Sequence, residues 1–421
     1  MEARSVSPDL SFNGKNVNKT ISEFLKTLSY TDVASGSSDS ISLKLHNITM
    51  DWLKNWYPTK GDKIVASLLF KNWEKENAHL NLACGSFILD TIGFTGGPLE
   101  ASFDGLAIPV NDTFKSTERT KTWKDVNIKQ IQSEIAKKYG LAASYDAGTI
   151  KISSIEQSEK SDSAFLYDVC KSYGLAMKVF QNRIVIFDKG KYEKKAPVTT
   201  IHREDFVDDE WDFKDTLEGT YTGARVSYKN AQDNKELSMY VGLKAENASG
   251  SRPMKVNEQA SDINDAGYKG AAKVNEANES ATTLSGKIWP NPKIVSGVTV
   301  DVSGLGKADG KYYVDKVTTE VSDKTTMQVE LHKCQQRVTY VPQVITTAPK
   351  KKTYKVGDIV NFKGGTHYVS SYPGSRGYKV SGGRAKITIA NGSGKAHPWH
   401  LITENWSQTH VYGWVDEGTF E

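Results

Sequence analysis

The side chains best suited to binding chemistry gather near the C-terminal end of the sequence. Half of the eight histidines fall there, among many tyrosines and tryptophans. The residues that we single out as a possible groove for a ligand or partner are His367, Tyr368, Tyr372, His397, Trp399, His400 and Trp414. Aromatic faces stack on apolar ring surfaces, which favours a carbohydrate or a peptide as the ligand. The same aromatic side chains could also form the core of a small barrel, which needs large residues.

A zinc site in this segment is the less favoured interpretation. His397, His400 and His410 could supply nitrogen ligands, but no carboxylate or cysteine joins them at a zinc-motif spacing. The sequence therefore predicts no metal site here.

Other candidate motifs are equally incomplete. The acidic run 204–215 has no calcium-loop spacing and is best interpreted as a solvated acidic loop. The run 304–311 has several glycines but not the spacing of a phosphate-binding loop, so we expect a hairpin turn. Neither G-x-S-x-G nor H-E-x-x-H occurs. We predict no catalytic and no cofactor-binding residue, and hence not an enzyme.

The three cysteines, Cys84, Cys170 and Cys334, are far apart in the sequence. They make no ligand spacing, which indicates reduced, structural thiols. His332 would share a strand face with Cys334, but a coincidental neighbour is the better interpretation than a catalytic pair.

Composition excludes several classes of protein. A chain of 421 residues suggests two to four domains of about 150 residues. No window approaches 18 continuous apolar residues, which excludes a helical membrane span, and the N-terminus has no apolar core of a signal peptide. The net charge of +4 argues against a specific nucleic-acid partner.

The elements around these residues are mostly strands, and two groups of strands resemble each other. Each group has a Pro-led turn, a strand opened by Gly, and then a Gly followed by an apolar triplet and an Asp, at 85–90 and again at 310–315. We favour a duplication over chance similarity of alternating strands. Three such chains around an axis would display six similar units, which could mate with a sixfold ring. The candidate assembly edges are the strands 63–70, 85–96, 296–304 and 311–320.

Helical spacing predicts two further features. Small residues recur every three or four positions over 255–285, which predicts a long amphipathic helix that lies close to its neighbours. A helix is also expected over 17–30. Between the strand groups, KYGLA at 138–142 matches SYGLA at 172–176, so we expect a duplicated α+β module whose helices end at left-handed glycines.

These features resemble the baseplate hub protein of contractile phage tails and R-type bacteriocins. The motifs are the strand TYTGARVSYKN (220–230), the helix with the small-residue stripe, and the run GVTVDVSGLGKADGKYYVDKV (297–317), and the resemblance spans about residues 10–340. The group includes the late-control-type hub of Gram-positive prophages and the hub portion of type VI secretion spikes. The resemblance implies two tube-forming β-domains in each chain, a homotrimer that makes a pseudo-sixfold ring, and no catalysis.

The last segment resembles the SH3-type barrel at the C-terminus of phage lysins and tail proteins. Four blocks carry the resemblance: YKVGDIVNFKGGTHYVSS (354–371), GGRAKITI (382–389), KAHPWHLI (395–402) and VYGWVDE (411–417). Such a domain would bind the cell wall or a neighbouring baseplate protein.

The sequence therefore predicts an α+β, mainly β, protein. The expected domains are tube β-domain I over 1–115, the α+β insertion module over 116–195, tube β-domain II over 196–345 with its helix over 255–285, and an SH3-like barrel over 346–421. The expected function is a structural hub that joins the tail tube to the central spike in a phage-tail-like particle, assembled in the bacterial cytoplasm. Its expected partners are the tube ring, spike, tape measure and wedge proteins, with no membrane and no cofactor. The alternatives are a tail-associated peptidoglycan hydrolase and a cell-wall-binding adhesin.

Overall fold

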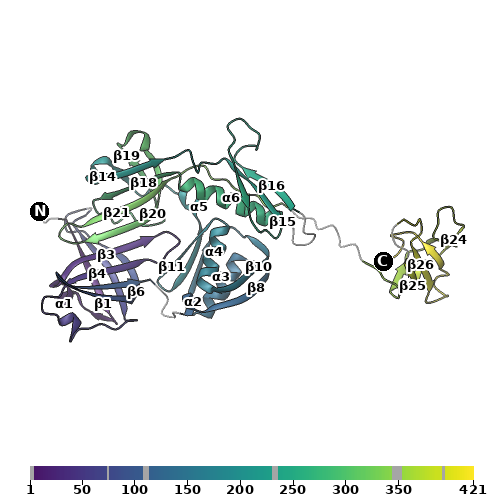
Figure 1. Ribbon diagram of the computed structural model, residues 1–421, viewed down its shortest axis with the longest axis horizontal. Coiled ribbons are helices and arrows are strands. Elements are labelled where there is room, and N and C mark those ends of the chain that lie inside the picture. Colours follow the sequence, from purple (N-terminus) through teal and green to yellow (C-terminus); the bar gives the residue numbers. More distant parts are fainter. Residues whose placement is uncertain (1–3, 74, 108–112, 230–235, 344–352, 391–393) are drawn as a thin grey trace. The chain divides into compact units, whose positions relative to one another are not determined.

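A computed structural model describes residues 4–421 except 74, 108–112, 230–235, 344–352 and 391–393 (Figure 1). The chain divides into two compact units, Met1–Pro342 and Gln343–Glu421. Strands dominate both units, so the prediction of a mainly β protein is confirmed.

One 13-stranded sheet forms the framework of the first unit. Its N-terminal strands are β1 (Ser5–Phe12), β2 (Lys15–Asn16), β3 (Leu25–Val33), β4 (Ser40–His46), β5 (Lys63–Lys71), β6 (His79–Gly96) and β7 (Leu99–Leu106). Its later strands are β13 (Thr200–His202), β14 (Phe206–Asp215), β18 (Thr282–Ile288), β19 (Thr299–Ser303), β20 (Gly310–Val321) and β21 (Thr326–Lys333). Short helical turns join them: α1 (Asn18–Ser22), η1 (Asp51–Leu53), η2 (Arg203–Asp205) and η3 (Gly306–Ala308).

The strands of this sheet are arranged as two repeats. The first repeat has the order β5-β6-β7-β4-β3 and the second has the order β19-β20-β21-β18-β14, with every neighbouring pair antiparallel. Each repeat is also connected in the same sequence order. Equal order and equal connections argue for a duplication, because alternating strands alone would not reproduce a topology.

Individual irregularities recur at matching positions. The register between β6 and β7 shifts at Asp90, and the register between β20 and β21 shifts at Asp315. Five residues earlier, Gly85 has a φ of 110° and Gly310 a φ of 141°, a region that favours glycine. The Gly-to-Asp motif found in the sequence thus marks the same bulged strand twice.

Backbone hydrogen bonds repeat as well. Gly61 N donates to Leu89 O at 2.9 Å, and Gly297 N donates to Val314 O at 2.8 Å. Leu89 and Val314 lie directly before the two bulges, so the repeats agree bond by bond at this point.

The two repeats meet in one sheet, because β20 pairs with β3 (Figure 1). Three of the four predicted assembly edges are wrong for the single chain, because β5 lies between β1 and β6, β19 between β13 and β20, and β20 between β21 and β3. The alternation of polar and apolar residues reports which face of a strand is buried, but not whether its edges are paired. In β6 the strand pairing with β5 ends at Ile88, so within the part of the chain that the structure describes no strand pairs with 91–96 on that side.

The insertion between the repeats contains two β-α-β runs. Its elements are α2 (Thr113–Ser116), β8 (Glu118–Asn127), α3 (Ile128–Lys138), β9 (Ala142–Asp146), β10 (Lys151–Ser161), α4 (Asp162–Ser172), β11 (Leu175–Phe180), β12 (Arg183–Asp188) and α5 (Lys189–Glu193). Gly140 and Gly174 follow the two longer helices with φ of 66° and 72°, so both left-handed helix ends are as predicted.

A separate three-stranded sheet packs against the longest helix. It consists of β15 (Gly223–Lys229), β16 (Glu236–Gly242) and β17 (Pro253–Asn257), and the helix is α6 (Ile263–Glu279). The helix predicted over 255–285 is thus too long at both ends. Residues 253–257 pair with β15, and residues 282–288 pair with β14 and β21, so sheet pairing replaces helix there.

The small residues of α6 do allow close packing. A Cβ placed on Gly270 would lie 2.4 Å from Val226 Cγ2, and one on Gly267 would lie 2.4 Å from the ring of Tyr340. Larger side chains at these positions would hold the helix away from the strands.

The helix predicted over 17–30 is also wrong beyond its first turn. α1 ends at Ser22, and Leu28 and Tyr30 are buried on one face of β3. Pairing of β3 with both β4 and β20 outweighs the local helical spacing.

The second unit contains a six-stranded sheet in the order β22-β25-β26-β27-β23-β24. The strands are β22 (Ile359–Phe362), β23 (Gly365–Tyr368), β24 (Gly377–Val380), β25 (Gly383–Ala390), β26 (Trp399–Thr403) and β27 (Tyr412–Val415). It has its own core, which includes Val360, Phe362, Ile387, Leu401 and Val415. The SH3-type barrel and the four domain boundaries stay predictions.

Candidate assembly surfaces and a buried ion network

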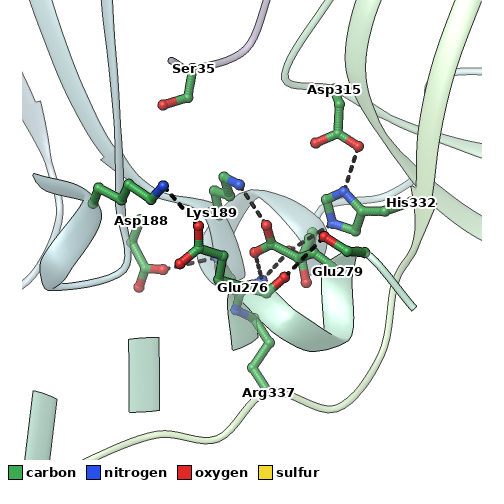
Figure 2. A network of polar contacts seen from close by, with 12 residues as sticks. Ser35, Asp188, Lys189, Glu276, Glu279, Asp315, His332 and Arg337 are labelled. Carbon is green, nitrogen blue, oxygen red and sulfur yellow. Dashed lines mark hydrogen bonds and ion pairs between the residues drawn. The ribbon is translucent and has the colours of Figure 1, made fainter. Parts of the chain in front are cut away.

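A buried ion network joins several elements of the first unit (Figure 2). Glu193 ends α5, Glu279 ends α6, Asp315 is the bulge residue of β20, and His332 lies on β21. Arg337 comes from the segment after β21. The network therefore holds the insertion, the long helix and the second repeat together.

Arg337 lies at the centre of the network. Its Nη1 donates to Glu279 Oε1 at 2.8 Å and also to Glu193 Oε1. Lys189 Nζ donates to Glu279 Oε2 at 2.7 Å. Burial by itself would raise the pKa of Glu279, but the charges of Lys189, Arg337 and His332 outweigh it and lower that pKa to about 2.

His332 lies between two carboxylates. Its Nδ1 is 2.7 Å from Asp315 Oδ2, and its Nε2 is 3.3 Å from Glu193 Oε1. Burial lowers the pKa of this imidazole, but the hydrogen bonds to Asp315 and Glu193 outweigh burial and raise the pKa to about 9. At neutral pH the raised pKa favours a charged imidazole, so His332 joins Lys189 and Arg337 as a third cationic side chain of the network.

The network has the residue types of a metal site but not its open geometry. One ligand atom each from Glu193, Glu279 and His332 lies within 4.8 Å of the others. However, the guanidinium of Arg337 contacts both glutamates, and both imidazole nitrogens are hydrogen-bonded. These candidate ligand atoms are thus already engaged by neighbouring charged side chains, so the arrangement is suited to holding segments together.

The seven residues singled out in the C-terminal unit do not form one continuous group. His397 stacks on Tyr368 with ring centroids 3.5 Å apart, and its Nδ1 is hydrogen-bonded to Asp416. Trp399 packs against the core residue Phe420 and the partly buried Tyr354. These contacts serve the interior of the unit, as expected for part of the aromatic set.

Three others lie together on strands β23, β26 and β27. His400 makes an edge contact with Trp414, at a centroid distance of 5.2 Å, and another with Tyr412. His367 Nδ1 accepts a hydrogen bond from Tyr412 N at 3.0 Å. Burial lowers the pKa of both histidines, which favours neutral rings.

Tyr372 stands apart from these groups. It is exposed, and Lys395 Nζ lies 3.8 Å from its ring centroid. The predicted groove therefore stays a prediction, and its best-grouped part is His367, His400 and Trp414 together with the exposed Tyr412.

Sequence reasoning missed the ion network almost entirely. Glu193, Glu279 and Arg337 carry no motif, and His332 was weighed only as a neighbour of Cys334. The one sequence signal that pointed toward the network was the Gly-to-Asp motif at 310–315, because its Asp315 is hydrogen-bonded to His332. All three cysteines are free thiols. Among the described residues, none of the helices is both long enough and apolar enough to cross a bilayer.

The fold of the first unit is similar to that of a solved tail protein. The structure superposes on the tail protein from Neisseria meningitidis MC58 with a TM-score of 0.58 at 12% sequence identity, covering 78% of this chain and 97% of that protein. At this identity the likeness concerns the fold alone.

Two curated relatives carry the name probable baseplate hub protein. One is from Escherichia phage 186, 26% identical over 241 residues, and the other is from Escherichia phage P2, 25% identical over 240 residues. The matches cover 56% and 55% of this chain and 59% of each relative, so the chain spans under two thirds of the length of the curated relatives it matches. The predicted resemblance to baseplate hub proteins is confirmed. No family model matches the chain.

Proposed function

We propose that this chain is the structural central hub of a contractile tail baseplate. It forms a homotrimer with pseudo-sixfold symmetry that joins the tail tube to the central spike and nucleates assembly. The observation that carries the proposal is the duplicated strand group, with matching order, bulges and glycines. The similarity to baseplate hub proteins supports the same role.

The physical argument is one of symmetry matching. A cyclic trimer of a chain with two similar repeats presents six similar units around one axis. Such a ring can mate with a sixfold tube on one side and a threefold spike on the other. The tape measure and wedge proteins are the further partners in this proposal, within a phage or bacteriocin particle.

The hub role is non-enzymatic. The most chemically suggestive cluster, around Glu193, Glu279 and His332, has its donor atoms engaged by Arg337 and neighbouring side chains. A zymogram with the purified chain on cell-wall substrate should show no clearing. A clearing zone would replace the hub proposal by that of a tail-associated hydrolase.

The direct test is the oligomeric state of the full chain. Native mass spectrometry across a concentration series should show a trimer, and class averages of negatively stained particles should show a ring with near-sixfold features. A monomer at all concentrations, with no density at the tail tip of particles labelled with an antibody to this chain, would contradict the proposal.

A second candidate role, binding to the cell wall, is favoured by exposed aromatic residues of the C-terminal unit. Tyr372, Tyr378, Trp406 and Tyr412 are all exposed. The full chain should sediment with purified Gram-positive cell walls, and the Tyr372→Ala and Tyr412→Ala changes together should reduce the bound fraction severalfold. Binding that is unaffected by both changes would argue against these aromatic residues as the contact.

A further inference from the structure

The two repeats within one chain are joined by a strand pair. This pair is a model for how the repeats of two different copies could be joined. Residues 316–321 of β20 pair antiparallel with residues 28–33 of β3. At the middle of this joint the hydroxyl oxygens of Thr31 and Thr318 are 3.2 Å apart. The joint uses the second half of β20, beyond its bulge, on the side where β19 pairs with the first half.

Each of the two strands in this joint has a counterpart in the other repeat. The counterpart of β20 is β6, and the counterpart of β3 is β14, by their places in the two strand orders. Among the described residues, neither counterpart has a partner where the joint would be. β14 pairs only with β18, and the pairing of β6 with β5 ends before residue 91.

We propose that 91–96 of β6 in one copy pairs antiparallel with 211–216 of β14 in the next copy. The inference rests on the proposed hub function and specifies the contact between its subunits. The register of this contact follows from the pairing of β20 with β3. Asp90 of β6 is aligned with Asp315 of β20, and β14 is aligned with β3 through their pairings with β18 and β4. Thr95 then faces Asp212 across the joint.

The same register places Phe94 opposite Phe213. Both aromatic rings are only half-buried in the single chain, whereas their counterparts Thr319 and Tyr30 are 1% and 4% exposed. Pairing across the joint would cover the two rings. Trp211, which is 39% exposed, lies at the end of the same strip.

The open edges of β6 and β14 also favour pairing with a strand rather than with another kind of partner. An unpaired edge exposes backbone N–H and C=O groups that pair readily with another strand. Because β6 and β14 belong to opposite ends of the duplicated arrangement, the contact is head-to-tail. A head-to-tail contact closes into a ring when its rotation allows, and the intrachain joint supplies a similar contact between repeats.

The test is disulfide trapping with cysteines on the exposed residues Thr95 and Asp212. Directly opposed strand residues have Cβ atoms about 5 Å apart, which is within reach of a disulfide after a small shift. The variant with Thr95→Cys and Asp212→Cys should give covalent dimers and trimers under mild oxidation.

The matched control moves one cysteine along the strand. In the variant with Thr91→Cys and Asp212→Cys, the cysteines are four residues out of register, about 13 Å, so little cross-linking is expected. Mixing the two single variants, Thr95→Cys and Asp212→Cys, should give covalent dimers and nothing larger, because each chain then carries one introduced cysteine. Hydrogen exchange of the wild-type chain should also show protection of 91–96 and 211–216 in the trimer relative to dilute monomer.

The outcomes separate this contact from the hub proposal. A trimer that neither cross-links at Thr95 and Asp212 nor protects the two strands overturns the contact and leaves the hub proposal standing. Equal cross-linking in the control overturns the register. A monomer at all concentrations, without cross-links, overturns both.

Discussion

Arg337 is the residue on which the buried ion network depends. It is the cation that contacts both Glu193 and Glu279, and its own side chain is largely buried. Removing one member of a buried charge cluster leaves the others desolvated and unpaired. Its importance comes from position, because nothing in its sequence surroundings distinguishes it from an exposed arginine.

The Arg337→Leu change should therefore destabilise the first unit by about 3 to 5 kcal/mol. The control is Arg225→Leu, whose partner Glu246 is bound at a more exposed site, where a much smaller loss of stability is expected. Urea unfolding followed by tryptophan fluorescence measures both. Equal effects of the two changes would contradict a special role for the network.

The protonation of His332 should make stability depend on pH in the alkaline range. Its pKa is raised from 6.5 to about 9 in the folded state, so the folded chain binds this proton more tightly than the unfolded chain. The stabilisation is full below pH 6.5 and is lost as the pH rises through about 9, amounting to about 3 kcal/mol.

Denaturant unfolding at pH 6.5, 8 and 9.5 measures this loss as a declining free energy of unfolding. The His332→Gln variant should show a smaller decline over the same interval, while the exposed His79→Gln variant serves as the control. A His332→Gln profile parallel to that of the wild type would show that another group causes the decline.

At the scale of elements, pairing with adjacent strands decides whether several segments form a strand or a helix. β3 forms where helical spacing suggested a helix, because it is held between β4 and β20. α6 is shortened because sheet pairing captures the residues on both sides of it. The small-residue stripe of α6 nevertheless behaves as the sequence suggested, since its glycines allow close contact with the small sheet.

The close approach at Gly270 leads to a stability prediction. The Gly270→Val change places atoms against Val226, where a Cβ would already be 2.4 Å away, and should cost about 1 to 3 kcal/mol. The control is Gly148→Val, where a Cβ would meet nothing within 4 Å. Thermal unfolding of the two variants should show a clearly lower midpoint only for Gly270→Val.

At the scale of the whole molecule, the two compact units should unfold separately. Each unit has its own buried apolar clusters, and the clusters of the first unit lie within Met1–Pro342. Calorimetry of the full chain should therefore show a transition that disappears when 343–421 is removed, while the midpoint of the first unit changes little.

Truncation after residue 333 is the matched comparison for this experiment. It also removes Arg337 and the buried Val338, whose N–H and C=O are both bound by the Asn275 side chain. The first unit should then lose stability strongly. If truncation after residue 342 has the same effect, the two units are coupled.

The confirmed predictions concern patterns within short stretches of the sequence. The mainly β composition, the Gly-to-Asp motif at both bulges and the left-handed glycines at 140 and 174 could all be found in the sequence. Such features depend on the conformational range of single residues and on alternation along a strand. The resemblance to baseplate hub proteins rests on patterns of this kind.

The sequence by itself determined that the chain would be rich in strands and internally repeated. The alternation of apolar and polar residues and the positions of the glycines can both be found in the sequence. Only the tertiary structure decided which strand edges are paired, that β20 joins β3, and that His332, Glu193 and Arg337 meet. These outcomes depend on contacts between segments far apart in sequence. Local propensity carries no information about which distant strand or charge will lie alongside.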